Sequence, residues 1–263
     1  MTRLKLLVIL GGLGLMSVSC RTDATTPIFY SLPDSYAVCE NGDTSTFRMQ
    51  YDNLQRIVSY NCPEEDEFIS FFYDISGRLN RIDMTGAGQT QKMEISYSKN
   101  GDPVSAVVSI IKEGTNRICG RRFIDYEMME GKVTGMKVLE TGGSSHQVRL
   151  DYSGEDLVRM TSIGNAGFVS HEFELGRKRS PFASARFRHV LSADLPLILC
   201  STKEFTGHTI VLSEGMTIST KIENHTHPNG AFICIKEPIE ISGRNAFTPQ
   251  GPDQTIKDPI FSI

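Results

Sequence analysis

The chain has 263 residues, of which 39% are hydrophobic and 22% are charged, a composition typical of a globular protein. Its net charge is −4, and removal of an N-terminal leader that contains Arg3 and Lys5 would make it more acidic. Nucleic-acid-binding proteins usually carry a basic stripe, so the charge argues against a nucleic-acid partner.

The N-terminus has the organisation of a secretory signal. A basic start leads into an apolar run over residues 6–16, and small residues at 17–19 precede Cys20. A charged start, an apolar centre of about 7–15 residues and a small-residue cleavage site are typical of a signal peptide and not of a membrane span. With a cysteine directly after the cleavage site, the segment resembles a bacterial lipoprotein signal, in which that cysteine is acylated and becomes the new N-terminus. The resemblance implies a lipoprotein signal peptide over residues 1–19 and lipidation of Cys20. The alternative is an ordinary signal peptide cut near Ser19.

A lipid anchor would hold the mature protein on a membrane without crossing it. No later segment has the roughly 18 consecutive apolar residues that a spanning helix needs. We therefore expect residues 20–34 to act as a tether between the membrane and a folded domain.

Five tyrosines repeat through the first two thirds of the chain at intervals of 22 to 29 residues. Each ends a stretch in which apolar and polar residues alternate, and each is followed by a short polar turn and a second alternating stretch. Strict alternation predicts half-buried strands, and glycines in the turns supply the positive φ that tight hairpins need. The pattern therefore predicts a meander of antiparallel hairpins. The repeated tyrosines are Tyr51, Tyr73, Tyr97, Tyr126 and Tyr152.

The second repeat resembles the YD unit of Rhs-type repeats, since it reads Tyr73-Asp74-Ile75-Ser76-Gly77-Arg78-Leu79. The third repeat has Ser98 in place of the aspartate and the fourth has Glu127. Together with the lipoprotein start, the chain resembles an uncharacterised family of Bacteroidetes lipoproteins with a porin-like antiparallel β-fold. That family has no established activity. The resemblance therefore implies a fold and a place in the cell envelope, at the outer membrane of a Gram-negative bacterium, and it implies no catalytic residues.

We expect one all-β domain over residues 35–236, an antiparallel up-and-down meander of about 12–14 strands curled into a barrel or half-barrel. The tyrosine repeats occupy residues 47–175, and variant hairpins occupy residues 205–236. Residues 183–200 lack period-two spacing, which predicts a short helix or an irregular crossing segment. Residues 237–263 contain several prolines and are expected to form a poorly ordered tail.

The alternating stretches predict strands of about 5–8 residues, whereas a bacterial membrane barrel needs about 9–11 residues per strand and aromatic girdles. The chain has no tryptophan. We therefore expect a lipid-anchored sheet surrounded by water, with a small outer-membrane β-barrel as an alternative.

The cysteines do not predict a disulfide framework. Without Cys20 their number is odd and their spacings are wide and irregular. One bridge is compatible with an oxidising compartment, but the sequence does not select it. No C-x-x-C motif occurs, which argues against a thioredoxin-like site or a zinc ribbon. The remaining cysteines are Cys39, Cys62, Cys119, Cys200 and Cys234.

Two clusters have the residue types of a metal site. His225 and His227 alternate as strand residues would, but turn residues follow them and no third ligand is evident. The acidic run at residues 64–67 lacks the spacing of an EF-hand loop. We interpret the histidines as exposed turn residues and the acidic run as a solvated hairpin loop. We therefore expect no metal and no cofactor.

No nucleophile elbow, H-E-x-x-H motif or P-loop lysine is present. The leading hypothesis is a non-enzymatic binding or scaffold module of the cell envelope, whose partner is another envelope protein, a glycan or a small amphiphile. The alternative is a secreted hydrolase of envelope polymers, because a triad can be widely spaced in sequence. The five repeated tyrosines could line a ligand groove as a stacking ladder, but we favour cross-strand packing at equivalent positions of a repeat.

Overall fold

The computed structural model describes residues 32–40, 42–115, 117–226 and 232–242. Within these residues the chain forms fifteen strands and two single-turn 3₁₀ helices. The strands are β1 (Ser35–Glu40), β2 (Asp43–Tyr51), β3 (Ile57–Cys62), β4 (Glu67–Tyr73), β5 (Leu79–Gly86), β6 (Gln89–Tyr97), β7 (Pro103–Lys112), β8 (Arg117–Met129), β9 (Lys132–Glu140), β10 (Ser145–Ser153), β11 (Asp156–Gly164), β12 (Gly167–Arg179), β13 (Lys203–Leu212), β14 (Thr217–Thr226) and β15 (Phe232–Ser242). The 3₁₀ helices are η1 (Pro63–Glu65) and η2 (Leu197–Leu199). None of the described helices is long and apolar enough to span a membrane.

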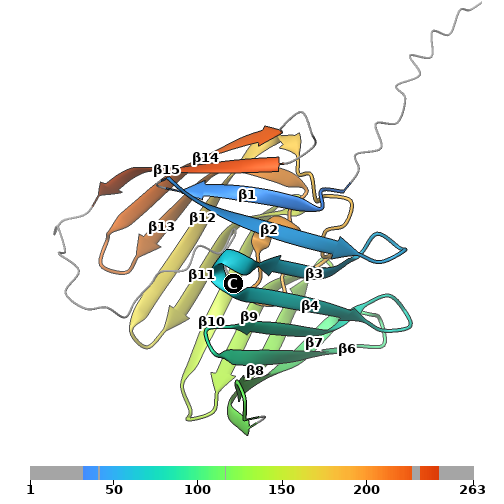
Figure 1. Ribbon diagram of the computed structural model, residues 1–263. Coiled ribbons are helices and arrows are strands. Elements are labelled where there is room, and N and C mark those ends of the chain that lie inside the picture. The colour runs from blue at the N-terminus through green and yellow to red at the C-terminus, as the bar shows by residue number, and fades with distance from the viewer. Residues whose placement is uncertain (1–31, 41, 116, 227–231, 243–263) are drawn as a thin grey trace, which may run out of the picture. The chain divides into compact units, whose positions relative to one another are not determined.

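Each strand pairs antiparallel with the next one along the chain, and β1 pairs with β15 in parallel, so that the sheet closes into a barrel (Figure 1). The closing pair is parallel because an up-and-down meander with an odd number of strands begins and ends in the same direction. The prediction of an all-β, up-and-down antiparallel meander that curls on itself is confirmed. The count exceeds the expected 12–14 partly because β1 precedes the first tyrosine repeat.

The strands are longer than the sequence pattern suggested. They run from six to thirteen residues, and β8 and β12 have thirteen each. The prediction of 5–8 residues was wrong for most of them because the hydrogen-bonded ladder continues through polar ends that do not alternate. For example, β8 begins at Arg117, well before the stretch in which Ile124, Tyr126 and Met128 alternate with acidic residues. Strand length therefore does not argue against a membrane barrel.

The C-terminal boundary also differs from the expected one. β15 continues to Ser242 and so passes Lys236, where the predicted domain ends and the predicted tail begins. Its ladder with β14 runs over the whole of that stretch. The remaining tail residues, 243–263, lie outside the described residues, as do Cys20 and residues 1–31.

The interior of the barrel is apolar. Inward-facing side chains from successive strands, such as Ile69, Ile82 and Met93, have no measurable exposure. They belong to one continuous hydrophobic cluster. Charged residues alternate with them on the outer face, as period-two spacing requires.

A segment between β12 and β13, residues 180–202, crosses this interior, and we call it the plug (Figure 1). Its contacts reach strands that lie far apart around the ring. The Phe182 ring meets Tyr36 of β1 edge-on at 5.4 Å, and the Phe187 ring lies 4.8 Å from Phe71 of β4. The prediction of an irregular crossing segment is confirmed. Residues 189–199 of the plug lack period two because barrel wall surrounds them, whereas Ser184 and Arg188, nearer its start, are exposed.

The two ends of the barrel differ. The tyrosine turns and both ends of the plug lie at one end, because in an up-and-down meander every connection from an even to an odd strand falls there. The connections from odd to even strands lie at the opposite end, which we call the mouth.

Candidate functional site

The first tyrosine repeat builds a contact that runs from one hairpin to the next. Asp52 Oδ1 accepts hydrogen bonds from the backbone N–H groups of Leu54 and Arg56, at 2.9 and 3.0 Å. Its second oxygen forms a 2.5 Å ion pair with the Arg56 guanidinium. That guanidinium lies 4.2 Å from the ring centroid of Tyr73, in the next repeat. The Tyr73 hydroxyl in turn donates to the Ile57 carbonyl at 2.8 Å.

The second repeat copies this arrangement. Asp74 holds its own turn and pairs with Arg78 at 2.7 Å, and the guanidinium covers the Tyr97 ring at 5.0 Å. The Tyr97 hydroxyl donates to the Leu79 carbonyl at 2.5 Å. The backbone hydrogen bond from Arg78 holds the pKa of Asp74 below its usual value. The prediction that Asp52 and Asp74 hydrogen-bond their own turns is confirmed, and the repeat links each hairpin to its neighbour.

The third repeat keeps the turn without the aspartate. Ser98 Oγ accepts from the backbone N–H groups of Asn100 and Asp102, both at 3.2 Å. Gly101 in this turn has φ +88°, as Gly77 has φ +79° in the second repeat. Gln55 holds the equivalent position of the first repeat with φ +59°.

Exchanges at the left-handed turn position should have opposite effects on stability. Gly101→Val should lower the free energy of unfolding by more than about 1 kcal/mol, because a β-branched residue is strained at positive φ. Gln55→Gly should raise it by roughly 0.5–1 kcal/mol, because glycine relieves the same strain in the first repeat. Urea unfolding measures both changes, and a Val variant as stable as the wild type would contradict the turn assignment.

The repeated tyrosines face inward and are engaged by the chain itself. The Tyr51 hydroxyl donates to the Pro33 carbonyl at 2.9 Å, and the Tyr126 hydroxyl donates to the plug at Leu191 O at 2.8 Å. Lys132 lies over the Tyr152 ring at 5.7 Å. Burial raises the pKa of Tyr97 to about 12. These contacts favour the packing interpretation, and a ligand role for the tyrosines remains a prediction.

The structure describes one residue of the histidine pair and the whole acidic run. His225 lies in β14, not in a turn, and its Nε2 is 3.7 Å from Glu223. His227 lies outside the described residues. In the acidic hairpin loop around η1, Glu65 accepts a hydrogen bond from Ser45 at 2.7 Å. Within the described part of the chain, no group of three or more metal-ligating side chains forms.

The four cysteines whose side chains the structure describes are free thiols, namely Cys39, Cys62, Cys119 and Cys200. Burial raises the pKa of Cys62 to about 11 and that of Cys200 to about 12. A thiol that stays protonated at neutral pH is a poor nucleophile. These two cysteines therefore have a packing role.

The plug is anchored to the barrel wall at two places, one near the turn end and one near the mouth. Near the turn end, Asp156 of β11 accepts hydrogen bonds from Thr202 N at 2.6 Å and from Thr202 Oγ1 at 2.7 Å. Near the mouth, Arg122 of β8 pairs with Asp194 at the tip of the plug, at 2.8 Å. Arg122 also donates to Gln91 of β6.

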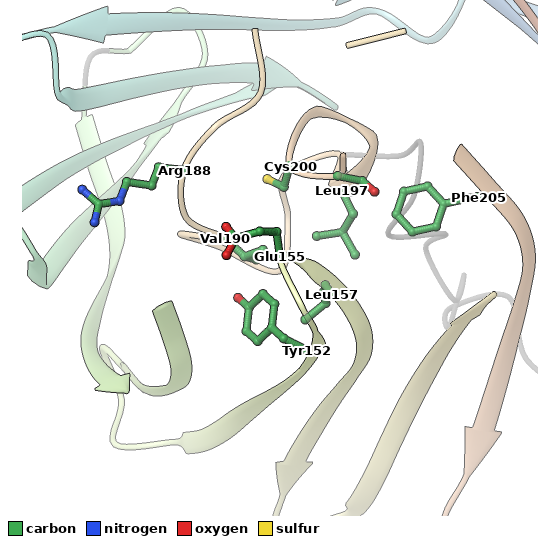
Figure 2. Close-up of a pocket in the computed structure, with 9 residues that line it drawn as sticks. Tyr152, Glu155, Leu157, Arg188, Val190, Leu197, Cys200 and Phe205 are labelled. Atoms are coloured by element: carbon green, nitrogen blue, oxygen red, sulfur yellow. The ribbon is translucent and has the colours of Figure 1, made fainter. Parts of the chain in front are cut away.

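Beside the plug at the turn end lies a small hollow of ≈ 10 Å³, lined by Tyr152, Leu157, Val190, Leu197 and Cys200 among others (Figure 2). Figure 2 shows Arg188 extending away from these side chains. A volume of this size holds at most about one water molecule. The hollow is therefore a packing defect and not a ligand site.

His189 is a buried, neutral imidazole of the plug. It is 8% exposed, and its Nδ1 has no hydrogen-bond partner among the described residues. Burial, together with the positive charge of Arg188, lowers the pKa of His189 to about 4, although Asp102 opposes the shift.

Acid should weaken the fold through His189. The unfolded chain binds the proton near pH 6.5 and the folded chain only near pH 4, so stability falls as the pH drops through that window. The loss should be about 2 kcal/mol after allowance for partial solvent access. In His189→Gln, the free energy of unfolding should change less with pH between these two values. Urea unfolding at a series of pH values measures this. An unchanged pH dependence would show that His189 is not the group responsible.

At the mouth, the wall and the tip of the plug line an open hollow of ≈ 300 Å³, which we call the mouth pocket. Its residues come from β6, β7, β8, the end of β9 with the residue after it, and the plug. They are Gln91, Ile110, Gly120, Arg121, Arg122, Glu140, Thr141 and Asp194.

Sequence reasoning did not single out the mouth pocket. Gln91 and Asp194 are more than a hundred residues apart, and the plug brings them to one guanidinium. The one local signal was a polar residue at an inward position of an alternating strand, such as Arg122 two residues before Ile124.

No family model matches the chain, and no curated protein matches it. Among solved structures, a porin-like protein from Bacteroides uniformis aligns at 12% identity over 72% of this chain and 79% of that one, with a TM-score of 0.30. A chain of the TcdB2-TccC3-Cdc42 structure aligns at 10% identity over 78% of this chain and 16% of that one, with a TM-score of 0.23. Both scores are too low to support an argument, and the lipoprotein family and YD-repeat membership remain predictions.

Proposed function

We propose that the chain is a lipid-tethered envelope protein whose plugged barrel stands in water and serves as a non-enzymatic binding module. The observation that carries the proposal is the distribution of polarity in the barrel. Its interior is apolar and filled by the plug, and its exterior carries paired charged residues as well as exposed apolar ones such as Phe72 and Phe123. A membrane barrel has the reverse arrangement, with an apolar outer band and a polar lumen.

The outer face supplies the supporting contacts. Lys137 of β9 pairs with Glu127 of β8 at 3.1 Å, and Arg159 of β11 pairs with Glu172 of β12 at 3.1 Å. All four side chains are about half exposed. Charged groups facing lipid would cost up to about 2–4 kcal/mol each. The outer face therefore favours a water-surrounded barrel over the outer-membrane alternative.

A filled interior limits what the protein can bind. The hollow beside the plug has a volume of only ≈ 10 Å³, so a small amphiphile would find little room there. This favours a glycan or protein partner that reaches the mouth or the outer face. The N-terminal signal and Cys20 support the envelope location.

Metabolic labelling with an alkyne fatty acid tests the anchor. The wild-type protein should take up the label and fractionate with membranes, and Cys20→Ala should lose the label. When a cleavable leader without a lipobox replaces residues 1–20, the chain should be secreted and remain soluble without detergent. A chain of this kind that stays in alkali-washed membranes would instead support the outer-membrane barrel.

A further inference from the structure

The mouth pocket has one basic and two acidic side chains on its inner side. Arg122 is largely buried, with 18% of its side chain exposed, and its guanidinium is held by Asp194 at 2.8 Å and by Gln91. Its positive charge is thus neutralised within the protein. Arg121 is the second guanidinium of the pocket lining and forms no ion pair within the described part of the chain.

Glu140 has a different environment. Its carboxylate accepts a hydrogen bond from Ser144 Oγ at 3.0 Å and forms no ion pair within the described part of the chain. An ionised carboxylate can accept about four hydrogen bonds, so Glu140 has acceptor capacity left for a ligand. The hydroxyl of Thr141, beside it, is engaged by the neighbouring strand, since it accepts from Arg121 N at 2.9 Å and donates to Arg121 O at 3.0 Å.

Gly120 provides the space. It lies at an inward position of β8 opposite Ile110, and a Cβ atom there would make only an ordinary 3.5 Å contact with the Ile110 side chain. No left-handed φ requires glycine at this position. The missing side chain therefore leaves part of the pocket open beside an apolar wall.

We propose that the mouth pocket binds one neutral sugar ring at the end of an envelope glycan. Neighbouring hydroxyls of a sugar can donate together to the two oxygens of one carboxylate, and they can accept from the Arg121 guanidinium, which also lines the pocket. Their ring carbons suit the wall of Ile110 and Gly120. The volume of ≈ 300 Å³ lies at the lower end of the range for ligand pockets, about 300–1,000 Å³, and this fits a single ring. The inference rests on the binding role proposed above and names its ligand.

Saturation-transfer NMR on the full-length protein tests this proposal, in a zwitterionic detergent that has no sugar headgroup. The probes are the methyl glycosides of glucose, galactose, mannose and N-acetylglucosamine, with lysine and alanine as non-sugar competitors. We expect at least one glycoside to bind with a millimolar Kd. No transfer to any of the four, or transfer to an amino acid alone, would overturn the proposal.

Two variants locate the site. Gly120→Leu should fill the pocket and Glu140→Gln should remove an acceptor, and each should weaken binding about tenfold or more. Gly164→Leu and Glu113→Gln are matched controls outside the pocket and should bind as the wild type does. Binding that survives both pocket variants would overturn the assignment. If Gly120→Leu fails to fold, Glu140→Gln still decides the question. A negative sugar result with an intact fatty-acid label at Cys20 would refute this inference alone and leave the lipid anchor standing.

Discussion

Replacing Phe182 with alanine should lower the free energy of unfolding by about 4 kcal/mol. The side chain has no exposed surface, and its ring meets Tyr36 at 5.4 Å. Tyr36 itself stacks on Phe47 at 4.9 Å and shares a 2.5 Å hydrogen bond with Tyr60. The closed wall around this aromatic cluster can collapse little into the vacated space, so the cavity should persist.

Urea unfolding measures the loss, and Phe168→Ala is the matched control. Phe168 is 40% exposed on β12, so its truncation should cost less than about 1 kcal/mol. The Phe182→Ala cavity should also bind a small apolar molecule such as benzene, which would raise the melting temperature of this variant alone. Equal losses at the two positions would contradict the internal position of the plug.

The Asp156→Ala variant should lose about 3 kcal/mol of unfolding free energy, since it leaves buried donors without an acceptor. Asp156 is 2% exposed. Its carboxylate accepts hydrogen bonds from Thr202 N, from Thr202 Oγ1 and, at 3.3 Å, from Ser201 Oγ. No basic side chain pairs with it in the described residues, so hydrogen bonds alone fix this end of the plug.

Two controls separate the anchor from general effects of charge removal. Asp156→Asn keeps one acceptor oxygen and should cost about 1 kcal/mol. Asp151→Ala removes an exposed carboxylate that pairs with Arg159 at 3.8 Å and should cost less than about 0.5 kcal/mol. Destabilisation by Asp151→Ala as large as that by Asp156→Ala would refute the anchoring role.

Strand alternation and turn geometry were sufficient to predict the repeated hairpins from the sequence. Tyr73, Asp74 and Gly77 were interpretable in sequence because a strand alternates every second residue and a tight turn needs a residue that tolerates positive φ. The next contact, Arg78 over Tyr97, was not evident. It depends on the lateral distance between hairpins, which the sheet sets.

Strand ends and the last strand were less accessible to sequence analysis. The polar start of β8 and the Pro238-containing β15 both pair in ladders although neither alternates cleanly. Whether such residues belong to a strand is determined by hydrogen bonding to a neighbouring strand and not by the pattern of their side chains. A one-dimensional pattern therefore ended these strands too early.

The sequence by itself determined the all-β class and the succession of hairpins, because side-chain alternation and turn geometry act over a few residues. Only the tertiary structure decided which strands residues 180–202 pack against and which residues form the mouth pocket. A barrel of fifteen strands encloses a volume that must be filled, and the segment that fills it is selected by packing against strands from the whole ring. The pocket follows from that choice, because Asp194 reaches Arg122 only when the plug lies inside the barrel.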